Sequence, residues 1–212
     1  MRENLLYTRF LALLNSTQQN CNYVAQDWLK RMKTIAIEDK KIIENIKDEY
    51  RRRGWIRDLI LFVLSINTGA KLIYLLNLKV GDVKGKNFLK IKDSVKVARI
   101  YTLNNEIKSL LEEYCKNLSK TEFLFLSMRN SAKPIDRIEV FRKFKTICED
   151  LGLSDRYSVA SWRKTFGYHY YKKFKDLALL QWIYGQNTPE ETLNFIGMKV
   201  NFNDKLNKEF CL

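Results

Sequence analysis

The sequence predicts an α+β fold that is mainly helical and carries a small antiparallel three-stranded sheet. Apolar residues recur at helical spacing over most of the chain, as they do from Trp55 to Asn67. Three short runs in the middle of the chain, residues 88–91, 95–102 and 121–127, have the apolar, β-branched or aromatic character of strands. Hydrophobic residues make up 46% of the 212 residues, and only 2 residues are proline, which is typical of a folded globular chain.

Helices are expected on both sides of each predicted strand region. Before the strands, apolar periodicity and the breaker Gly69 predict helices within residues 1–33, 34–53, 55–67 and 70–78. A further helix with Ile107 and Leu111 on one face separates the second strand from the third. The chain therefore alternates helical and extended segments only in its middle part.

The last third of the chain is predicted to be helical. Residues 136–151 form one helix, and a second follows with Trp162 on its apolar face. Asp176 is a candidate N-cap for a helix over residues 177–184, which Gly185 ends. Residues 188–191 (TPEE) have the form of a capping box with proline at the first helical position, so position 195 lies near the middle of a short helix.

Composition favours a polyanionic partner. Lysine and arginine outnumber aspartate and glutamate by 38 to 24, which gives a formal net charge of +14. This excess favours nucleic acid before membrane, the alternative being a solvated surface with no partner. No run of about 18 apolar residues or signal peptide is present, and the 4 cysteines and 1 histidine show no metal-site spacing. We expect a cytoplasmic protein with no metal and no cofactor.

Two segments carry a resemblance to a known family. The first is residues 68–78 (TGAKLIYLLNL), followed by Asp82-Val83, and the second is residues 160–166 (ASWRKTF). Together with Tyr184-Gly185-Gln186, they resemble the catalytic domain of the tyrosine recombinase (phage integrase) family. The resemblance implies double-stranded DNA as partner and a role in DNA recombination, integration or transfer of a mobile element. It divides the chain into a short N-terminal helical segment (1–33), a catalytic-type domain (34–198) and a C-terminal tail (199–212).

The family's phosphate-binding and proton-transfer residues fall on four positions. Its two phosphate-clamping arginines fall on Lys71 and Arg163. At the first of these positions, lysine keeps the positive charge of arginine but cannot donate two parallel hydrogen bonds to one phosphate. Two positions that transfer protons in the family fall on Ala160 and Gln186, which have no acid–base capacity. The resemblance therefore implies that phosphate binding is retained and that proton transfer is lost.

The nucleophile and the hairpin lysine of the family complete the comparison. The family's lysine general acid falls on Lys92 or Lys96, and the turn length leaves both open. Its nucleophilic tyrosine falls on Phe195, which has no hydroxyl to attack a phosphate. We therefore expect a DNA-binding protein that is unable to cleave DNA by the usual route.

Each candidate also has a structural interpretation. Arg163 could be an ion-pair partner, Lys71 a surface lysine and Phe195 a core aromatic residue. Other basic side chains are candidates for the DNA surface, although each run is also typical of a solvated face. They are Arg51, Arg52, Arg53, Lys164, Lys172 and Lys173.

Two other functions stay open. One is an atypical recombinase or nicking enzyme whose tyrosine is displaced, with Tyr184 as first candidate, or was replaced by engineering at position 195. The other is an interaction module that modulates an active recombinase. Either function is compatible with a homo-oligomer or with a partner recombinase. The tail, residues 199–212, could dock onto a neighbouring protomer or fold back onto its own protomer.

Overall fold

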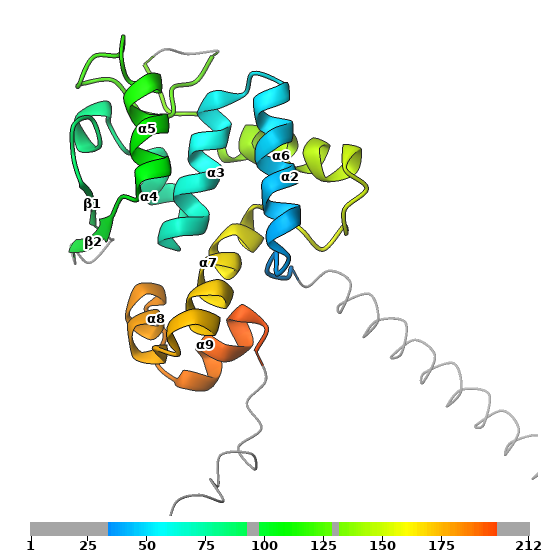
Figure 1. The fold of residues 1–212 in the computed structure, drawn as a ribbon. Helices are drawn as coiled ribbons and strands as arrows, with labels where there is room; N and C mark the ends of the chain where they lie inside the picture. Colours follow the sequence, from blue (N-terminus) through cyan, green and yellow to red (C-terminus); the bar gives the residue numbers. More distant parts are fainter. Residues whose placement is uncertain (1–33, 93–97, 129–131, 199–212) are drawn as a thin grey trace, which may run out of the picture. The chain divides into compact units, whose positions relative to one another are not determined.

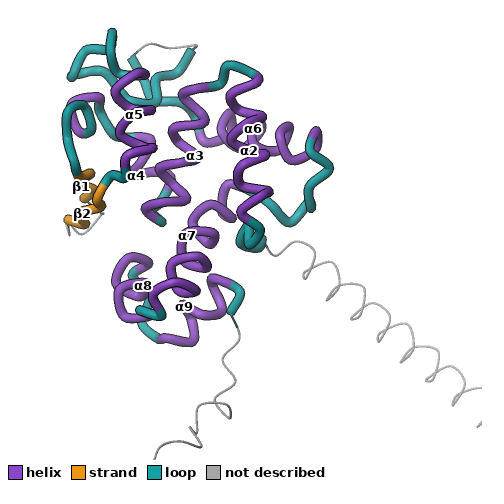
Figure 2. Tube along the Cα trace, in the orientation of Figure 1, coloured by secondary structure: helices purple, strands orange, loops and turns teal. Residues whose placement is uncertain are grey.

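The computed structural model describes residues 34–92, 98–128 and 132–198, which form helices and one β-hairpin (Figure 1, Figure 2). The chain divides into two units, Met1–Thr34 and Ile35–Leu212, and every element below lies in the second. The predicted mainly helical α+β class is confirmed. Predictions for residues 1–33, the hairpin turn and the tail lie outside the described residues.

Helix α3 is the centre of the fold. It spans Ile56–Thr68, and most of it is buried because it packs against α2 (Lys40–Arg52), α5 (Asn105–Tyr114) and α7 (Val159–Phe174). Its end is set by Gly69, whose φ of 63° is left-handed. The predicted stop is therefore confirmed, and the chain turns there into the short α4, Leu72–Leu76.

The hairpin consists of β1 (Phe88–Lys92) and β2 (Ala98–Thr102), which pair antiparallel. It follows a single 3-10 turn, Val80–Asp82. Burial alternates along β1, with Leu89 and Ile91 directed into the core. The hairpin thus covers one side of the helices and exposes its other face.

The predicted third strand does not form, so the described sheet has two strands rather than three. Residues 121–127 make only isolated bridges, Lys79 with Phe123 and Leu126 with Pro134. The segment crosses the loop before the hairpin instead of joining the hairpin, since the N–H of Leu124 donates to the carbonyl oxygen of Leu78 at 2.8 Å. Pro134 has no N–H with which to extend a ladder. The segment is still buried at Leu124 and Phe125, as its apolar sequence indicates.

Three aromatic rings meet where α3, α6 (Arg137–Asp150) and α7 cross. Trp162 of α7 is fully buried, and its ring lies edge-on to Phe62 and Phe144, with centroids 5.5 and 5.1 Å away. Edge-to-face contacts of this kind add to the free energy gained from burial. The cluster fixes the rotation of α7 about its own axis.

The C-terminal helices end and begin where the sequence predicts. α8 spans Leu177–Tyr184, with Asp176 as N-cap, and ends at Gly185, whose φ is 67°. α9 spans Pro189–Ile196, and the hydroxyl of Thr188 accepts from the N–H of Glu191. The carboxylate of Glu191 accepts from the N–H of Asn187 rather than from that of the N-cap residue, so the capping box is a variant.

Gly167 allows the C-terminal helices to approach α7. A Cβ atom at this position would overlap the hydroxyl of Tyr184 at the end of α8 and press on Ile196 of α9. A second apolar cluster forms there from Leu180, Ile183, Tyr184, Leu193 and Ile196. The absence of a side chain at Gly167 therefore sets the depth at which α8 and α9 pack.

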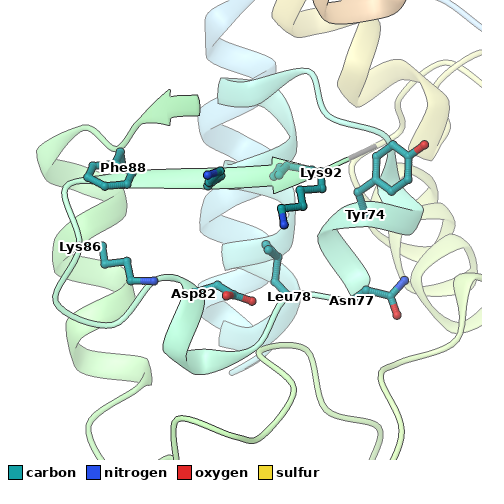
Figure 3. A pocket seen from close by; sticks show the side chains of 9 residues that line it. Tyr74, Asn77, Leu78, Asp82, Lys86, Phe88 and Lys92 are labelled. Atoms are coloured by element: carbon teal, nitrogen blue, oxygen red, sulfur yellow. The ribbon is translucent and has the colours of Figure 1, made fainter. Parts of the chain in front are cut away.

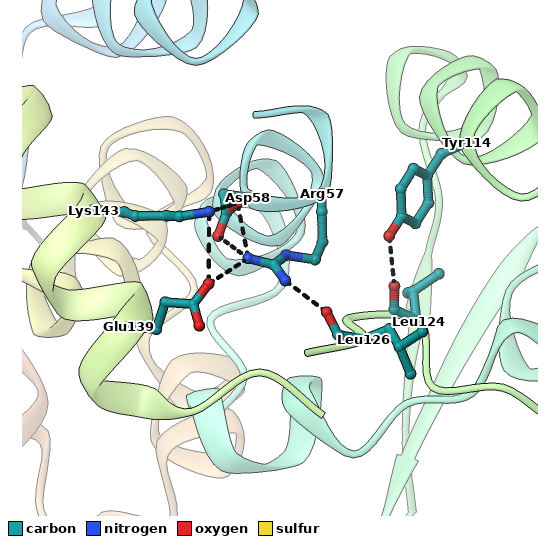
Figure 4. Close-up of polar contacts among 7 residues, drawn as sticks. All are labelled: Arg57, Asp58, Tyr114, Leu124, Leu126, Glu139 and Lys143. Carbon is teal, nitrogen blue, oxygen red and sulfur yellow. Dashed lines mark hydrogen bonds and ion pairs between the residues drawn. The ribbon is translucent and has the colours of Figure 1, made fainter. Parts of the chain in front are cut away.

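A buried carboxylate joins α3 to α6 (Figure 4). Asp58 is 3% exposed and accepts from Lys143 at 2.9 Å and from Arg57 at 3.2 Å. Arg57 also pairs with Glu139 at 2.9 Å and donates to the carbonyl oxygen of Leu126 at 2.6 Å. Because every charge in the network has an opposite partner, its burial is tolerated.

Two cysteines, Cys115 and Cys148, are buried free thiols. Burial raises the pKa of Cys148 to about 12, so it stays protonated at neutral pH. Among the helices of the described ranges, none is long and apolar enough to span a bilayer.

Removing Asp58 should destabilise the protein much more than breaking a surface pair. Asp58→Ala leaves Arg57 and Lys143 with one acidic partner in a buried setting, and we expect a loss of about 3 kcal/mol in the free energy of unfolding. Urea denaturation measures it. The matched control is Lys145→Ala, which breaks an exposed pair with Glu149 and should cost less than about 1 kcal/mol. Equal losses would contradict the network's role.

Gly167→Ala should also destabilise the protein, by about 1–3 kcal/mol, because the added methyl group forces α8 and α9 away from α7. Thermal and urea unfolding measure this loss. Asn45→Ala, an exposed substitution within α2, is the control and should change stability by about 0.5 kcal/mol or less. If the stability of the Gly167→Ala variant equals that of the unaltered protein, the contact with Tyr184 adjusts to the methyl group without loss of stability.

Candidate functional site

Lys71 stands where the chain turns from α3 into α4. Thr68 closes the last turn of α3 by donating its hydroxyl to the carbonyl oxygen of Leu64 at 2.8 Å. Gly69 then passes so close to Phe166 of α7 that a Cβ atom would overlap the ring. Lys71 follows as the exposed N-cap residue of α4. The glycine turn therefore holds Lys71 next to α7, the helix that carries Arg163.

Arg163 is a half-buried cation held by neutral partners. Its Nη2 atom donates to the carbonyl oxygen of Tyr184 at 3.2 Å and, more weakly, to that of Ile183 at 3.4 Å. Its guanidinium carbon lies 4.7 Å from the centre of the Tyr184 ring. Burial lowers the pKa of Arg163, and the nearby charge of Arg99 is a smaller contribution in the same direction. Neither the carbonyls nor the ring neutralises its charge.

Five positions singled out from the sequence line one hollow of about 890 Å³, here called the large hollow. They come from the start of α4, from α7, from the turn after α8 and from α9: Lys71, Ala160, Arg163, Gln186 and Phe195. The rest of the lining is largely apolar and includes Ile73, Ile138 and Phe141, which are exposed. The fold thus brings together residues that are more than a hundred positions apart in the sequence.

Phe195 is both a packing residue and part of the wall of the large hollow. It is half-buried, and its ring lies edge-on to Tyr184 with the centroids 4.9 Å apart. The Nζ atom of Lys164 lies 5.3 Å from the centre of the same ring. Phe195 therefore presents an aromatic ring without a hydroxyl group at this wall.

Tyr184 also lines the large hollow, but its hydroxyl is engaged elsewhere. The hydroxyl donates to the carbonyl oxygen of Arg163 at 2.8 Å and lies against Gly167. Burial raises the pKa of Tyr184 well above its ordinary value. The phenol is thus held, in its protonated form, against the backbone of α7.

A second hollow of about 470 Å³, here called the basic hollow, lies beside the large one. The two share the residues Ala70, Lys71, Arg163, Tyr184 and Gln186. The basic hollow is further lined by β2, which contributes two residues that the sequence analysis missed, Arg99 and Tyr101. The signal that could have found them is the alternation within β2, which places these two side chains on one face of the strand.

The two hollows are strongly basic. Four of their described lining residues are lysine or arginine, namely Lys71, Arg99, Arg137 and Arg163, and none of the described lining residues is aspartate or glutamate. Cations gathered in a concave surface raise the local concentration of anions. The arrangement can therefore bind an anionic group.

Lys92 lies at the end of β1 and lines a third hollow of about 380 Å³ with Tyr74, Asn77 and Asp82 (Figure 3). Tyr74 also lines the basic hollow, so the two hollows meet at its ring. Arg163 is not part of the lining around Lys92. Lys96 lies outside the described residues, and the choice between Lys92 and Lys96 stays a prediction.

The three consecutive arginines at the end of α2 are occupied by acidic partners. Arg51 pairs with Asp48 at 2.7 Å, and Arg52 and Arg53 each pair with Glu49 at 2.6 Å. Hydrogen bonds from Arg52 and Arg53 lower the pKa of Glu49 to about 2. The arginines line none of the three hollows.

The other predicted lysines lie on α7 but outside the hollows. Lys164 is 9% exposed and is directed toward Phe195. Lys172 and Lys173 are exposed in the last turn, where they lie over the rings of Tyr168 and Phe174. They are available to solvent on the same helix as Arg163.

The described side chains offer no metal centre. No group of three or more histidine, cysteine, aspartate or glutamate residues that could hold a metal ion occurs within residues 34–92, 98–128 and 132–198. His169 has a structural role, because its Nε2 atom lies 2.9 Å from the carbonyl oxygen of Ile37 and ties α7 to the segment before α2.

Known proteins with similar sequences are integrases and recombinases. Residues 36–197 match the model of the phage integrase family. The chain is 36% identical over 143 residues to the probable integrase/recombinase YoeC of Bacillus subtilis, a match that covers 67% of this chain and 78% of YoeC. It is 28% identical over 176 residues to the tyrosine recombinase XerH of Campylobacter jejuni, covering 80% of this chain and 48% of XerH.

Solved structures share the fold. The XerA recombinase superposes with a TM-score of 0.65 at 18% identity, over 81% of this chain and 61% of XerA. The XerH recombinase bound to its difH substrate gives 0.64 at 21% identity, over 81% of this chain and 52% of that chain. This chain thus spans about half to three fifths of these two recombinases. From the family match and the likeness to YoeC, the chain belongs to the phage integrase family of tyrosine recombinases.

Proposed function

We propose that this chain binds double-stranded DNA by holding a backbone phosphate between Lys71 and Arg163, and that it does not cleave DNA through position 195. The observation that carries the proposal is the lining of the basic hollow, where cations gather and the described lining residues include no carboxylate. The net charge of +14 supports long-range attraction to a polyanion. The XerH structure named above contains its DNA substrate, and a Tn1549 transposon integrase of the same fold also binds DNA.

Arg163 is suited to a phosphate because it is fixed before the ligand arrives. Its contacts with the end of α8 use part of the guanidinium and leave other N–H donors for an incoming oxygen. A planar guanidinium donates to two phosphate oxygens at once, and the bond is strengthened by the opposite charges. Lys71 adds an exposed point charge at the edge of the same hollow.

The proposed loss of cleavage rests on three side chains of the large hollow. Phe195 has no nucleophile, and Ala160 and Gln186 cannot exchange a proton near neutral pH. Tyr184 is a poor substitute, since its hydroxyl already donates to the backbone of α7 and its pKa is raised. Attack on a phosphate in line with its leaving group requires a free and accurately placed oxygen.

The wider role proposed here is in the recombination, integration or transfer of a mobile element. A protein that holds DNA at a recombination site without breaking it would act with an active recombinase or with further copies of itself. The relatives named above, among them a transposon integrase, favour this setting. The site that would be recognised is a phosphodiester backbone, which carries no sequence information by itself.

DNA binding should depend steeply on salt and on Arg163. We expect random-sequence duplex DNA to be bound more weakly as salt rises, because binding releases counterions. Arg163→Ala should weaken binding by about ten- to a hundredfold at a fixed salt concentration, since a hydrogen bond to a charged group contributes about 1.5–3 kcal/mol. Fluorescence anisotropy of a labelled duplex measures both effects.

The control for this prediction is Lys116→Ala, which removes one positive charge from an exposed position that lines no hollow. It should change affinity about twofold or less, as expected for an exposed charge away from the contact. The proposal would be contradicted, and a protein-interaction role favoured, if the affinity for DNA did not change with salt concentration. The same holds if Arg163→Ala and Lys116→Ala weakened binding equally.

The unaltered chain should form no covalent adduct with DNA, whereas Phe195→Tyr should form one slowly. The new hydroxyl would stand at the wall of the large hollow, which shares Lys71 and Arg163 with the basic hollow. We therefore expect a phosphate held by these two residues to be within its reach. Because Ala160 and Gln186 cannot transfer protons, strand cleavage should be slower by a factor of about 10²–10⁴ than in an enzyme that has general acid–base catalysis. Suicide substrates that trap the cleaved strand, followed by denaturing gels, measure the adduct.

Phe195→Leu is the control, because it perturbs the same wall without adding a nucleophile. An adduct with the unaltered chain would overturn the assignment of a lost nucleophile, and Tyr184→Phe would then identify the source. If Phe195→Tyr binds DNA normally and gives no adduct over days, position 195 does not face the bound phosphate.

A further inference from the structure

Two arginines that are 64 positions apart are anchored on the same turn of α8. Arg99 of β2 donates to the carbonyl oxygen of Trp182, from Nη2 at 3.0 Å and from Nε at 3.3 Å. Arg163 of α7 donates to the carbonyl oxygens of the next two residues, Ile183 and Tyr184. Both arginines line the basic hollow. Strand β2 and helix α7 therefore meet at the C-terminal end of α8.

The end of α8 is suited to hold two cations. The last carbonyl groups of a helix have no partner within it, and they form the negative end of the helix dipole. Here the N–H groups of Gly185 and Gln186 both return to the carbonyl oxygen of Gln181. The three carbonyls after Gln181 are the ones that receive the two guanidinium groups.

Aromatic rings fix both side chains further. The guanidinium carbon of Arg99 lies 5.0 Å from the centre of the Trp182 ring, as that of Arg163 lies 4.7 Å from the Tyr184 ring. A long side chain normally loses rotational freedom when it binds a ligand. Held by a ring and a carbonyl, each arginine has lost most of this freedom in advance, which favours binding.

The guanidinium groups of Arg99 and Arg163 lie close together in one hollow, so a single anion bound there would contact both. The charge of Arg99 contributes to the lowered pKa of Arg163, so the two groups are close enough to interact. A ligand with negative charge spread over two or more oxygens matches a pair of planar donors.

We propose that Arg99 is a second phosphate-binding arginine, and that Arg99 and Arg163 hold one and the same phosphodiester group in the basic hollow. The inference rests on the proposed function, since it specifies how the bound DNA is gripped. It adds a residue of the hairpin to the site, and it makes the end of α8 the platform that positions both guanidinium groups. Arg99 touches the ligand in this scheme, whereas Trp182 positions Arg99.

The test compares Arg99→Gln and Arg99→Lys with the unaltered chain, using anisotropy of a labelled random duplex over a series of salt concentrations. Arg99→Gln should weaken binding roughly tenfold at fixed salt, because a charge-assisted hydrogen bond is lost. It should also make the slope of log affinity against log salt shallower by up to about 0.9, the value for one phosphate. Arg99→Lys should keep the slope and lose part of the affinity, because it keeps the charge without the fork.

If the two arginines share one phosphate, the double variant Arg99→Gln/Arg163→Ala tests this directly. The contributions of two groups to the binding free energy are not additive when both groups contact the same ligand atoms. The double variant should therefore lose clearly less affinity than the product of the two single losses. A loss equal to that product would overturn the shared site and place the arginines on different phosphates.

The outcomes separate this inference from the proposed function. If the unaltered chain shows no salt-dependent binding, the proposed function fails, and the role of Arg99 in it fails too. If the unaltered chain binds and Arg163→Ala weakens it, but Arg99→Gln binds as the unaltered chain does, only the inference on Arg99 is overturned. Thermal unfolding of each variant shows whether the substitution has destabilised the fold around α8. Should Arg99→Gln unfold, Arg99→Lys and its double variant with Arg163→Ala carry the test.

Discussion

The burial of Trp162 determines how α7 packs against the other helices. Its ring is fully buried between Phe62 and Phe144, and this fixes α7 about its axis. The next residue, Arg163, is thereby directed to the other side, where the hollows lie. One turn further on, Gly167 meets the end of α8. A single helix therefore links the main core to the C-terminal cluster and carries the proposed phosphate site between them.

The site is built from backbone groups as much as from side chains. Arg99 and Arg163 are held by the carbonyls that α8 leaves open at its end, and Tyr184 returns a hydrogen bond to α7 through its hydroxyl. These contacts hold two positively charged side chains near one another. Under the proposed function, their orientation is fixed in the free protein before a phosphate binds.

The sequence allowed much of the fold to be predicted, because local chemistry sets where helices begin and end. Asp176, Thr188 and Gly185 take the roles that their side chains, or the lack of one, suggest. The prediction of a third strand was wrong because strand pairing is decided by distant chain segments. Phe123 bridges to Lys79 and not to the hairpin. Five of the positions that the resemblance marked line a common hollow, whereas Lys92 lines another one and Lys96 lies outside the described residues. Arg99 was missed. Alternation along the strand predicts only that Arg99 and Tyr101 share a face. That this face meets the end of α8 depends on the pairing of β2 and on where α8 ends, which distant segments of the chain decide.

Under the proposed function, this fold has lost its cleavage chemistry without losing its packing. Phe195 keeps the edge-on contact with Tyr184 that an aromatic ring provides, and a hydroxyl on that ring is not needed for it. Ala160 is exposed in the first turn of α7, where a smaller side chain leaves no cavity in the core. Arg99 and Arg163, in contrast, are anchored on carbonyls and rings that belong to the fold itself. Under the proposed function, groups that transfer protons or attack phosphorus are therefore free to vary, while groups that bind the phosphate are retained together with the helices that hold them.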